Sequence, residues 1–134
     1  MAVVTFPDPQ LATRNLLRNL LANRTEPVAA GATVSTKPPA EHQALPYVQV
    51  RSDGKFRDAR LNGRASVRVV VWHKDEGLGE ELASLCEALL LSSASPEIRG
   101  FSPLTGSIPT GDPDTGAPMS YFTLTARLSP RQIL

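Results

Sequence analysis

The residues with the most chemically suggestive pattern are Asp114-Thr-Gly-Ala117, the tetrapeptide that aspartic proteases carry at their active site. That chemistry needs two such aspartates, one from each half of a dimeric site, which share a single proton. Here the tetrapeptide follows Thr-Gly-Asp-Pro instead of an apolar strand, and only 18 residues come after Gly116. Because these residue types favour turns, we interpret the segment as a turn. An aspartic-protease-like enzyme that uses Asp114 is the less favoured alternative.

Metal-binding patterns are equally incomplete. Asp112 and Asp114 have the spacing of calcium ligands, but an EF-hand loop needs a bidentate carboxylate twelve residues in, and Thr123 occupies that position. His42 and His73 have no cysteine nearby and do not form a pair at zinc-ligand spacing. We therefore predict no metal site.

A third candidate is a phosphate-binding turn at Gly77 and Gly79, which follow a predicted strand and open a predicted helix. A dinucleotide-binding turn would have a third glycine where this chain has Leu82. Several carboxylates beside this turn would also repel a phosphate group. They are Asp75, Glu76, Glu80 and Glu81. We expect no cofactor, and we expect that the protein is not an enzyme.

Length and composition favour one small globular domain over residues 1–134. Hydrophobic residues make up 41% of the chain, while 12 prolines and 9 glycines indicate long connections between few elements. The single cysteine, Cys86, excludes an intramolecular disulfide, and its place in an apolar stripe predicts a buried thiol. With no signal-peptide pattern and no membrane-spanning stretch, we expect folding in a reducing cytoplasm and no membrane partner.

Charge is distributed unevenly although the net charge is only +1. Residues 1–64 contain nine Lys/Arg and five Asp/Glu, whereas residues 65–134 contain five and eight. A nucleic-acid-binding surface would interleave aromatic residues with its basic ones, and the basic stretch 51–68 offers only Phe56 before Trp72. We therefore interpret this stretch as a solvated hairpin face, or as a surface that meets an acidic neighbouring subunit.

The elements that would position these residues can be read from periodicity and capping signals. Asp8-Pro9 is a good helix start, and apolar residues at helical spacing follow it. Asp53-Gly54 predicts a tight turn that begins a hairpin arm through residues 55–61. The expected elements are helices at about 9–23 and 77–92, strands at about 45–52, 66–72 and 120–128, and a long loop at 102–118. Residues 28–36 could contain a short strand centred on 33–35, and residues 98–101 could form another.

Alternation along two strands predicts the fold class. Val67, Val69 and Val71 share one face of their strand, and Phe122, Leu124, Ala126 and Leu128 point inward from theirs. Apolar stripes on both helices need a flat surface to cover. We therefore predict an α+β fold: a single small, mostly antiparallel sheet with two α-helices packed on one face. The other face, which carries Thr123, Thr125 and Arg127, would contact water or another subunit.

The order and spacing of several landmarks resemble a known family. They are Val4-Thr-Phe-Pro-Asp8, Thr33-Val-Ser-Thr36, Leu45-Pro-Tyr-Val-Gln-Val-Arg51, Ala65-Ser-Val-Arg-Val-Val-Val-Trp72, Asp112-Pro-Asp-Thr-Gly-Ala-Pro118 and Tyr121-Phe-Thr-Leu-Thr125. Each piece alone is unspecific. Together they resemble the tail terminator (tail completion) proteins of siphovirus-type phages, which have long non-contractile tails, that infect actinobacteria.

The resemblance implies a non-enzymatic virion protein at the tail–neck junction, assembled in the host cytoplasm. Such a subunit forms a homo-hexameric ring on the tail tube, stops tube elongation, and then offers a joining surface to the head-closure (stopper) protein. Genomic DNA only passes through the channel. The alternatives are another neck component, such as a head-closure protein, and a host cytosolic adaptor.

Two segments are the candidate protrusions for these partners: the hairpin near residues 53–57 and the 102–118 segment. Exposure and charge are the reasons for choosing them. The candidate interface residues are Asp53, Lys55, Phe56, Arg57, Arg60, Asp112 and Asp114.

Overall fold

The computed structural model describes residues 3–133 and contains two sheets and two α-helices. In chain order the strands and helices are β1 (Val3–Thr5), α1 (Pro9–Ala22), β2 (Thr33–Ser35), β3 (Tyr47–Ala59), β4 (Asn62–Trp72), α2 (Glu76–Leu91), β5 (Ile98–Gly111), β6 (Pro118–Leu128) and β7 (Arg131–Ile133). A short 3₁₀ turn at Pro27–Ala29 connects α1 to β2.

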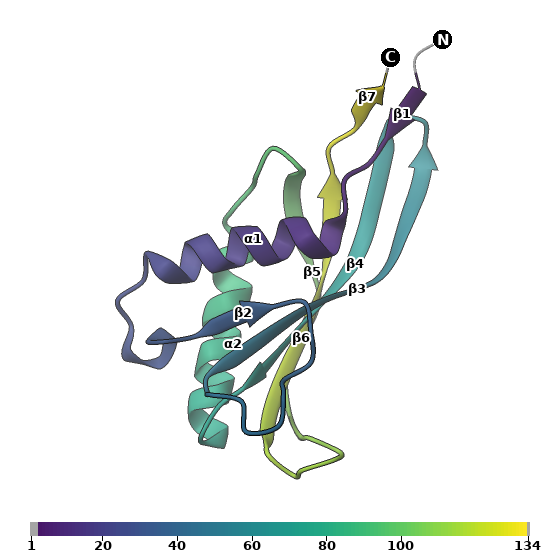
Figure 1. Cartoon of the computed structure of the whole chain (residues 1–134). Coiled ribbons are helices and arrows are strands. Elements are labelled where there is room, and N and C mark those ends of the chain that lie inside the picture. The colour runs from purple at the N-terminus through teal and green to yellow at the C-terminus, as the bar shows by residue number, and fades with distance from the viewer. Residues whose placement is uncertain (1–2, 134) are drawn as a thin grey trace.

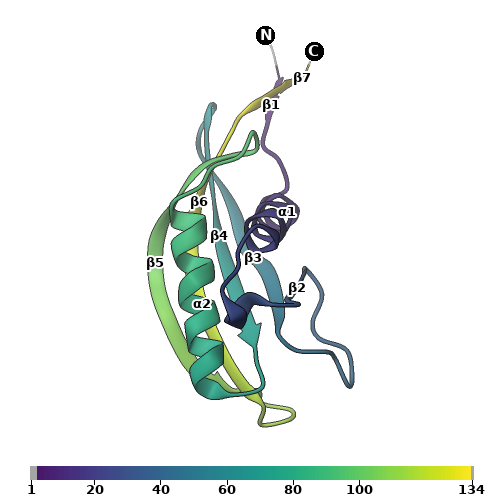
Figure 2. The same ribbon diagram turned by 90° about the vertical axis from the view of Figure 1, so that its left-hand side faces the viewer.

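The main sheet has five strands in the order β2-β3-β4-β6-β5, and both helices cover the same face of it (Figures 1 and 2). Its strands are antiparallel except for the parallel pair β2–β3. The first and last strands, β1 and β7, pair with each other in a separate two-stranded ribbon. The α+β prediction is confirmed, but the sheet is larger than expected and a second one accompanies it.

The start of α1 follows directly from its sequence. The Asp8 carboxylate accepts hydrogen bonds from the backbone N–H groups of Gln10 (2.9 Å) and Leu11 (3.2 Å), and Pro9 occupies the first turn. On the inner side of the helix, Leu17 and Leu21 are buried against the sheet. The Asp8 cap therefore determines where α1 begins.

Helix α2 begins at an Asp75 cap, whose carboxylate accepts from the Leu78 N–H at 3.0 Å. Its buried side is formed by Leu82, Cys86 and Leu90, whereas Leu78 in its first turn is exposed. Burial raises the pKa of the Cys86 thiol to about 12, as expected for a cysteine that packs as a small apolar residue.

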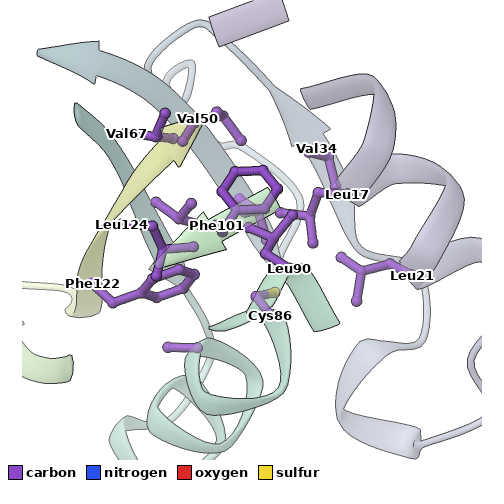
Figure 3. Close-up of a cluster of buried hydrophobic side chains, with 14 of the residues drawn as sticks. Leu17, Leu21, Val34, Val50, Val67, Cys86, Leu90, Phe101, Phe122 and Leu124 are labelled. Atoms are coloured by element: carbon purple, nitrogen blue, oxygen red, sulfur yellow. The ribbon is translucent and has the colours of Figure 1, made fainter. Parts of the chain in front are cut away.

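The core lies between the helices and the sheet (Figure 3). The alternation predicted for β4 and β6 is confirmed, because every inward residue named above is fully buried. β4 is the central strand of the sheet, which explains why it is apolar on both faces near its end. Phe122, Leu124, Val67 and Cys86 meet in this layer with Leu17 from α1.

Two local expectations were wrong. Residues 102–118 do not form a long loop, because β5 extends to Gly111 and only residues 112–117 turn back into β6. Pro103 and Pro109 are tolerated because β5 is an edge strand. Asp53-Gly54 is not a tight turn either: β3 continues through an irregularity there, and the hairpin turns at Arg60-Leu61.

Candidate protein-interaction surfaces

Asp112 organises the β5–β6 turn. Its Oδ1 accepts from the backbone N–H groups of Asp114 (2.8 Å) and Thr115 (3.3 Å), and its Oδ2 accepts from Trp72 Nε1 at 3.0 Å. The bonds from the Asp114 backbone and from Trp72 hold the pKa of this carboxyl below its ordinary value. Asp112 thus positions the turn on the end of the sheet, a structural role that its spacing to Asp114 did not reveal.

Asp114 itself is exposed at the tip of that turn. The chain reverses at Gly116, whose φ of 72° is in the left-handed region that suits glycine, and the Gly116 N–H donates to the Asp112 carbonyl at 2.8 Å. The turn predicted for the Asp114-Thr-Gly-Ala segment is confirmed. Within residues 3–133, no group of three or more His, Cys, Asp or Glu side chains could hold a metal ion.

The second protrusion is the arm, which we define as residues 54–65 at the β3–β4 turn (Figure 1). Its outer side carries Phe56, 45% exposed, with the Arg64 guanidinium stacked 4.9 Å above the ring centre. Ion pairs join Arg64 to Asp58 and, at the base of the arm, Arg68 to Asp53, each at 3.0 Å. Asp53 therefore neutralises a neighbour within its own chain.

On the inner side of the arm, Lys55 and Arg57 hold the N-terminal segment. Lys55 Nζ donates to the Phe6 carbonyl at 3.3 Å. The Arg57 guanidinium lies 4.7 Å above the Phe6 ring and donates to the Val4 carbonyl at 2.9 Å. Gly63 is needed opposite this ring, because a Cβ there would overlap Phe6. Lys55 and Arg57, two of the candidate interface residues, therefore make contacts within their own chain.

The end of the arm exposes a large apolar side chain. Leu61 in the turn is 49% exposed and lies next to Arg60, whose carbonyl accepts from Arg57 Nη1 at 2.9 Å. The β1–β7 ribbon extends from the same end of the sheet as the arm (Figure 1), and its paired residues Val3 and Ile133 are 60% and 47% exposed. We call Val3, Phe56, Leu61 and Ile133 the apolar end. Sequence reasoning named only Phe56 of these four.

Two open hollows lie where the arm meets the N-terminal segment. The larger, about 440 Å³, lies at the start of α1, and the smaller, about 290 Å³, lies against Phe6 and Phe56. Lys55 lines both. In the larger hollow the Ser52 hydroxyl donates to the Gly54 carbonyl at 3.4 Å and the Asp8 carboxylate caps α1, and within residues 3–133 no hydrogen bond joins these two side chains.

The face of the sheet without helices divides into two halves. Near the β5–β6 turn, Tyr47, Val70 and Trp72 form a second buried cluster, and the Tyr47 hydroxyl donates to the Lys37 carbonyl at 2.7 Å. Toward the arm the same face is open and carries Arg51, Arg68 and Arg127. The second face of the sheet is therefore polar, as predicted, only in the half next to the arm.

Comparison with known proteins finds a likeness of fold. A chain of the solved structure "Virion of native gene transfer agent (GTA) particle" superposes with a TM-score of 0.66 at 15% sequence identity. The match covers 87% of this chain and 93% of that chain. At this identity the likeness shows a shared fold. No family model and no curated protein matches the sequence.

Proposed function

We propose that this protein is a structural component of a phage-like virion. The observation that carries the proposal is the fold likeness to a chain of the gene transfer agent virion, which extends over nearly the whole length of both chains. The order of sequence landmarks points independently toward a virion protein, because it resembles that of phage tail terminators.

More specifically, we propose a tail terminator. In this role the chain forms a homo-hexameric ring on the tail tube, stops tube elongation, and presents its other side to the head-closure protein at the tail–neck junction. Virions assemble in the host cytoplasm, and DNA would only pass through the ring. None of the helices in residues 3–133 is long and apolar enough to cross a membrane, which is compatible with this location.

The shape of the subunit supports two axial partners. The arm and the β1–β7 ribbon extend from one end of the main sheet, and the β5–β6 turn lies at the other end (Figure 1). We assign the apolar end to one partner and the turn around Asp114 to the other. Asp53, Lys55, Arg57 and Asp112 support the fold, so of the candidates from the sequence we assign direct contact to Phe56 and Asp114, which are exposed on the two protrusions.

The test is negative-stain class averaging of the purified protein, alone and mixed with its tail tube protein. Sixfold rings, free or seated on tube ends, are the expected result. Rings that ignore tube ends but bind the head-side component would favour a head-closure role instead. Monomers or dimers that bind neither would contradict the proposal.

A further inference from the structure

The open half of the helix-free sheet face carries four arginines in two rows. Arg51 on β3 is the direct cross-strand partner of Arg68 on β4, and Arg64 on β4 is the direct partner of Arg127 on β6. Short hydroxyl side chains separate the rows: Ser66 and Thr125 are direct partners, and Ser102 pairs with Thr125 from β5. We call this surface the arginine face.

Internal contacts do not account for this arrangement. Like charges directly opposite each other across a strand pair are destabilising, and here two such pairs lie on one face. Arg68 and Arg64 are partly neutralised by Asp53 and Asp58. Among residues 3–133, no carboxylate forms an ion pair with Arg51, which is exposed.

Arg127 also lacks a carboxylate partner, and the surrounding residues leave space for its side chain. Its Nη1 donates to the Ser102 hydroxyl at 3.0 Å, and the described chain supplies it no carboxylate. Gly100 leaves room for the guanidinium, because a Cβ there would overlap Arg127 Nη2. The face therefore holds positive charge in position, and a partner with negative charge would complete it.

The opposite side of the same molecule carries that negative charge. The segment from Asp75 through α2 to Leu91 contains acidic residues and no basic one. The acidic side chains are Asp75, Glu76, Glu80, Glu81 and Glu87. Asp75, Glu76 and Glu81 are exposed, and α2 packs on the sheet face that the arginines do not share (Figure 2). The exposed surface of α2 is thus acidic and lies on the other side of the sheet from the arginine face, while α1 beside it carries Arg14 and Arg18.

We propose that the arginine face of one copy binds the exposed acidic side of α2 on the next copy. Contact between two identical faces would oppose like charges, whereas this head-to-tail contact pairs guanidinium groups with carboxylates. Repeated head-to-tail contacts close into rings when the rotation between copies allows. The inference rests on the ring proposed above and deepens it by naming the surfaces that join its subunits.

The decisive variant is Arg51→Glu with Arg127→Glu. Each substitution replaces a like-charge cross-strand pair by an opposite-charge pair, so the monomer keeps or gains stability while self-association weakens at least tenfold. Glu76→Lys with Glu81→Lys changes the α2 surface instead and weakens self-association by a similar factor. Combining all four changes in one chain restores association, as does mixing the two double variants in equal amounts. Sedimentation velocity measures the self-association, and thermal melting checks each fold.

A matched control is Arg14→Glu with Lys37→Glu, which makes the same change in net charge outside both surfaces and leaves association unchanged.

If wild-type protein forms rings and the face variants form them equally well, the inference is overturned and the ring function stands. If wild-type protein does not self-associate even on tube ends, both are overturned. If the arginine-face variant still assembles but loses affinity for DNA, the face binds nucleic acid and the inference is wrong.

Discussion

At the scale of single residues, Asp112 shows that a carboxylate can support a turn when its sequence context suggests ligand binding. It is bonded to two backbone N–H groups and to the Trp72 indole, and these donors stabilise its charged form. Arg57 is a similar case, since a side chain expected on an outer surface instead holds the N-terminal segment. For both residues, charge and spacing were visible in the sequence but the partners were not.

Asp112→Ala is expected to destabilise the protein by about 1 kcal/mol at neutral pH, because three donors lose their acceptor in a largely solvated turn. The folded-state pKa of this carboxyl is lowered, so its charge stabilises the fold above the unfolded-state pKa. That contribution is lost as pH falls through the folded value. The gap between wild type and variant should therefore narrow below about pH 4.

Urea titrations followed by circular dichroism at neutral and acidic pH would measure this gap. Asp114→Ala is the matched control in the same turn: its side chain is exposed, so the variant should stay within about 0.5 kcal/mol of wild type. Equal effects of the two substitutions, or an Asp112 effect that grows toward acid pH, would show that the turn does not depend on the Asp112 carboxylate.

At the scale of elements, the two parts of the arm have different roles. Its inner side holds the N-terminal segment, and its tip is exposed. Charge reversal at Arg57 would disturb its contacts with Val4 and Phe6, so loss of assembly in that variant would not identify an interface. Leu61 is a cleaner probe because it lies in the turn and is 49% exposed. We expect Leu61→Asp to leave the melting temperature unchanged and to weaken seating on tail tube ends at least tenfold, because a carboxylate would replace an apolar contact.

The exposed Leu104 on edge strand β5 provides a matched control, since it is 60% exposed and lies outside the arm. Leu104→Asp should seat on tube ends like wild type in a co-sedimentation assay. Equal binding by Leu61→Asp would remove the arm tip from the tube contact, and equal loss in both variants would point to a general loss of solubility.

The helices and the central strands were predictable because local signals agree with the packing around them. Asp8-Pro9 caps α1 as expected, and strict alternation in β4 and β6 gave the buried face correctly. The course of β5 was not predictable in this way. Its Pro, Gly and Thr residues are typical of loops, and the strand exists because β6 pairs with it along most of its length, with register shifts after Ile98, Pro103 and Thr105.

The candidate interaction surfaces were harder to foresee than the elements. Arg127 is far in sequence from Arg51 and Arg64, and only the register of β4 with β3 and β6 places the three on one face. The apolar end likewise requires the pairing of Val3 with Ile133, which joins the two ends of the described chain. A high density of basic residues at 51–68 was the available signal, and it identified the region but not its geometry.

At the scale of the whole molecule, the subunit is a plate with different properties on its sides and ends. One broad side is helical and is acidic along α2, the other is basic where it is open, and the arm and the β5–β6 turn lie at opposite ends. Side contacts and end contacts can therefore act independently. The proposed ring on a tube would use the sides for contacts between neighbouring copies and the ends for contacts with axial partners.

If native copies stabilise one another through these side contacts, the melting temperature must depend on protein concentration, because binding that favours the folded state shifts unfolding. A neighbour present at about 100 times its dissociation constant adds about 2.7 kcal/mol to the free energy of unfolding, which corresponds to a rise in melting temperature on the order of 10 °C for a domain of this size.

We expect the wild-type melting temperature to rise by several degrees between about 2 µM and about 200 µM protein. Added salt should reduce the rise, since it screens exposed charges. Arg51→Glu with Arg127→Glu should show a smaller rise over the same concentration range and, at the lowest concentration, should melt no lower than wild type. A wild-type melting temperature that stays constant while light scattering reports rings would mean that the ring contacts do not select the folded subunit.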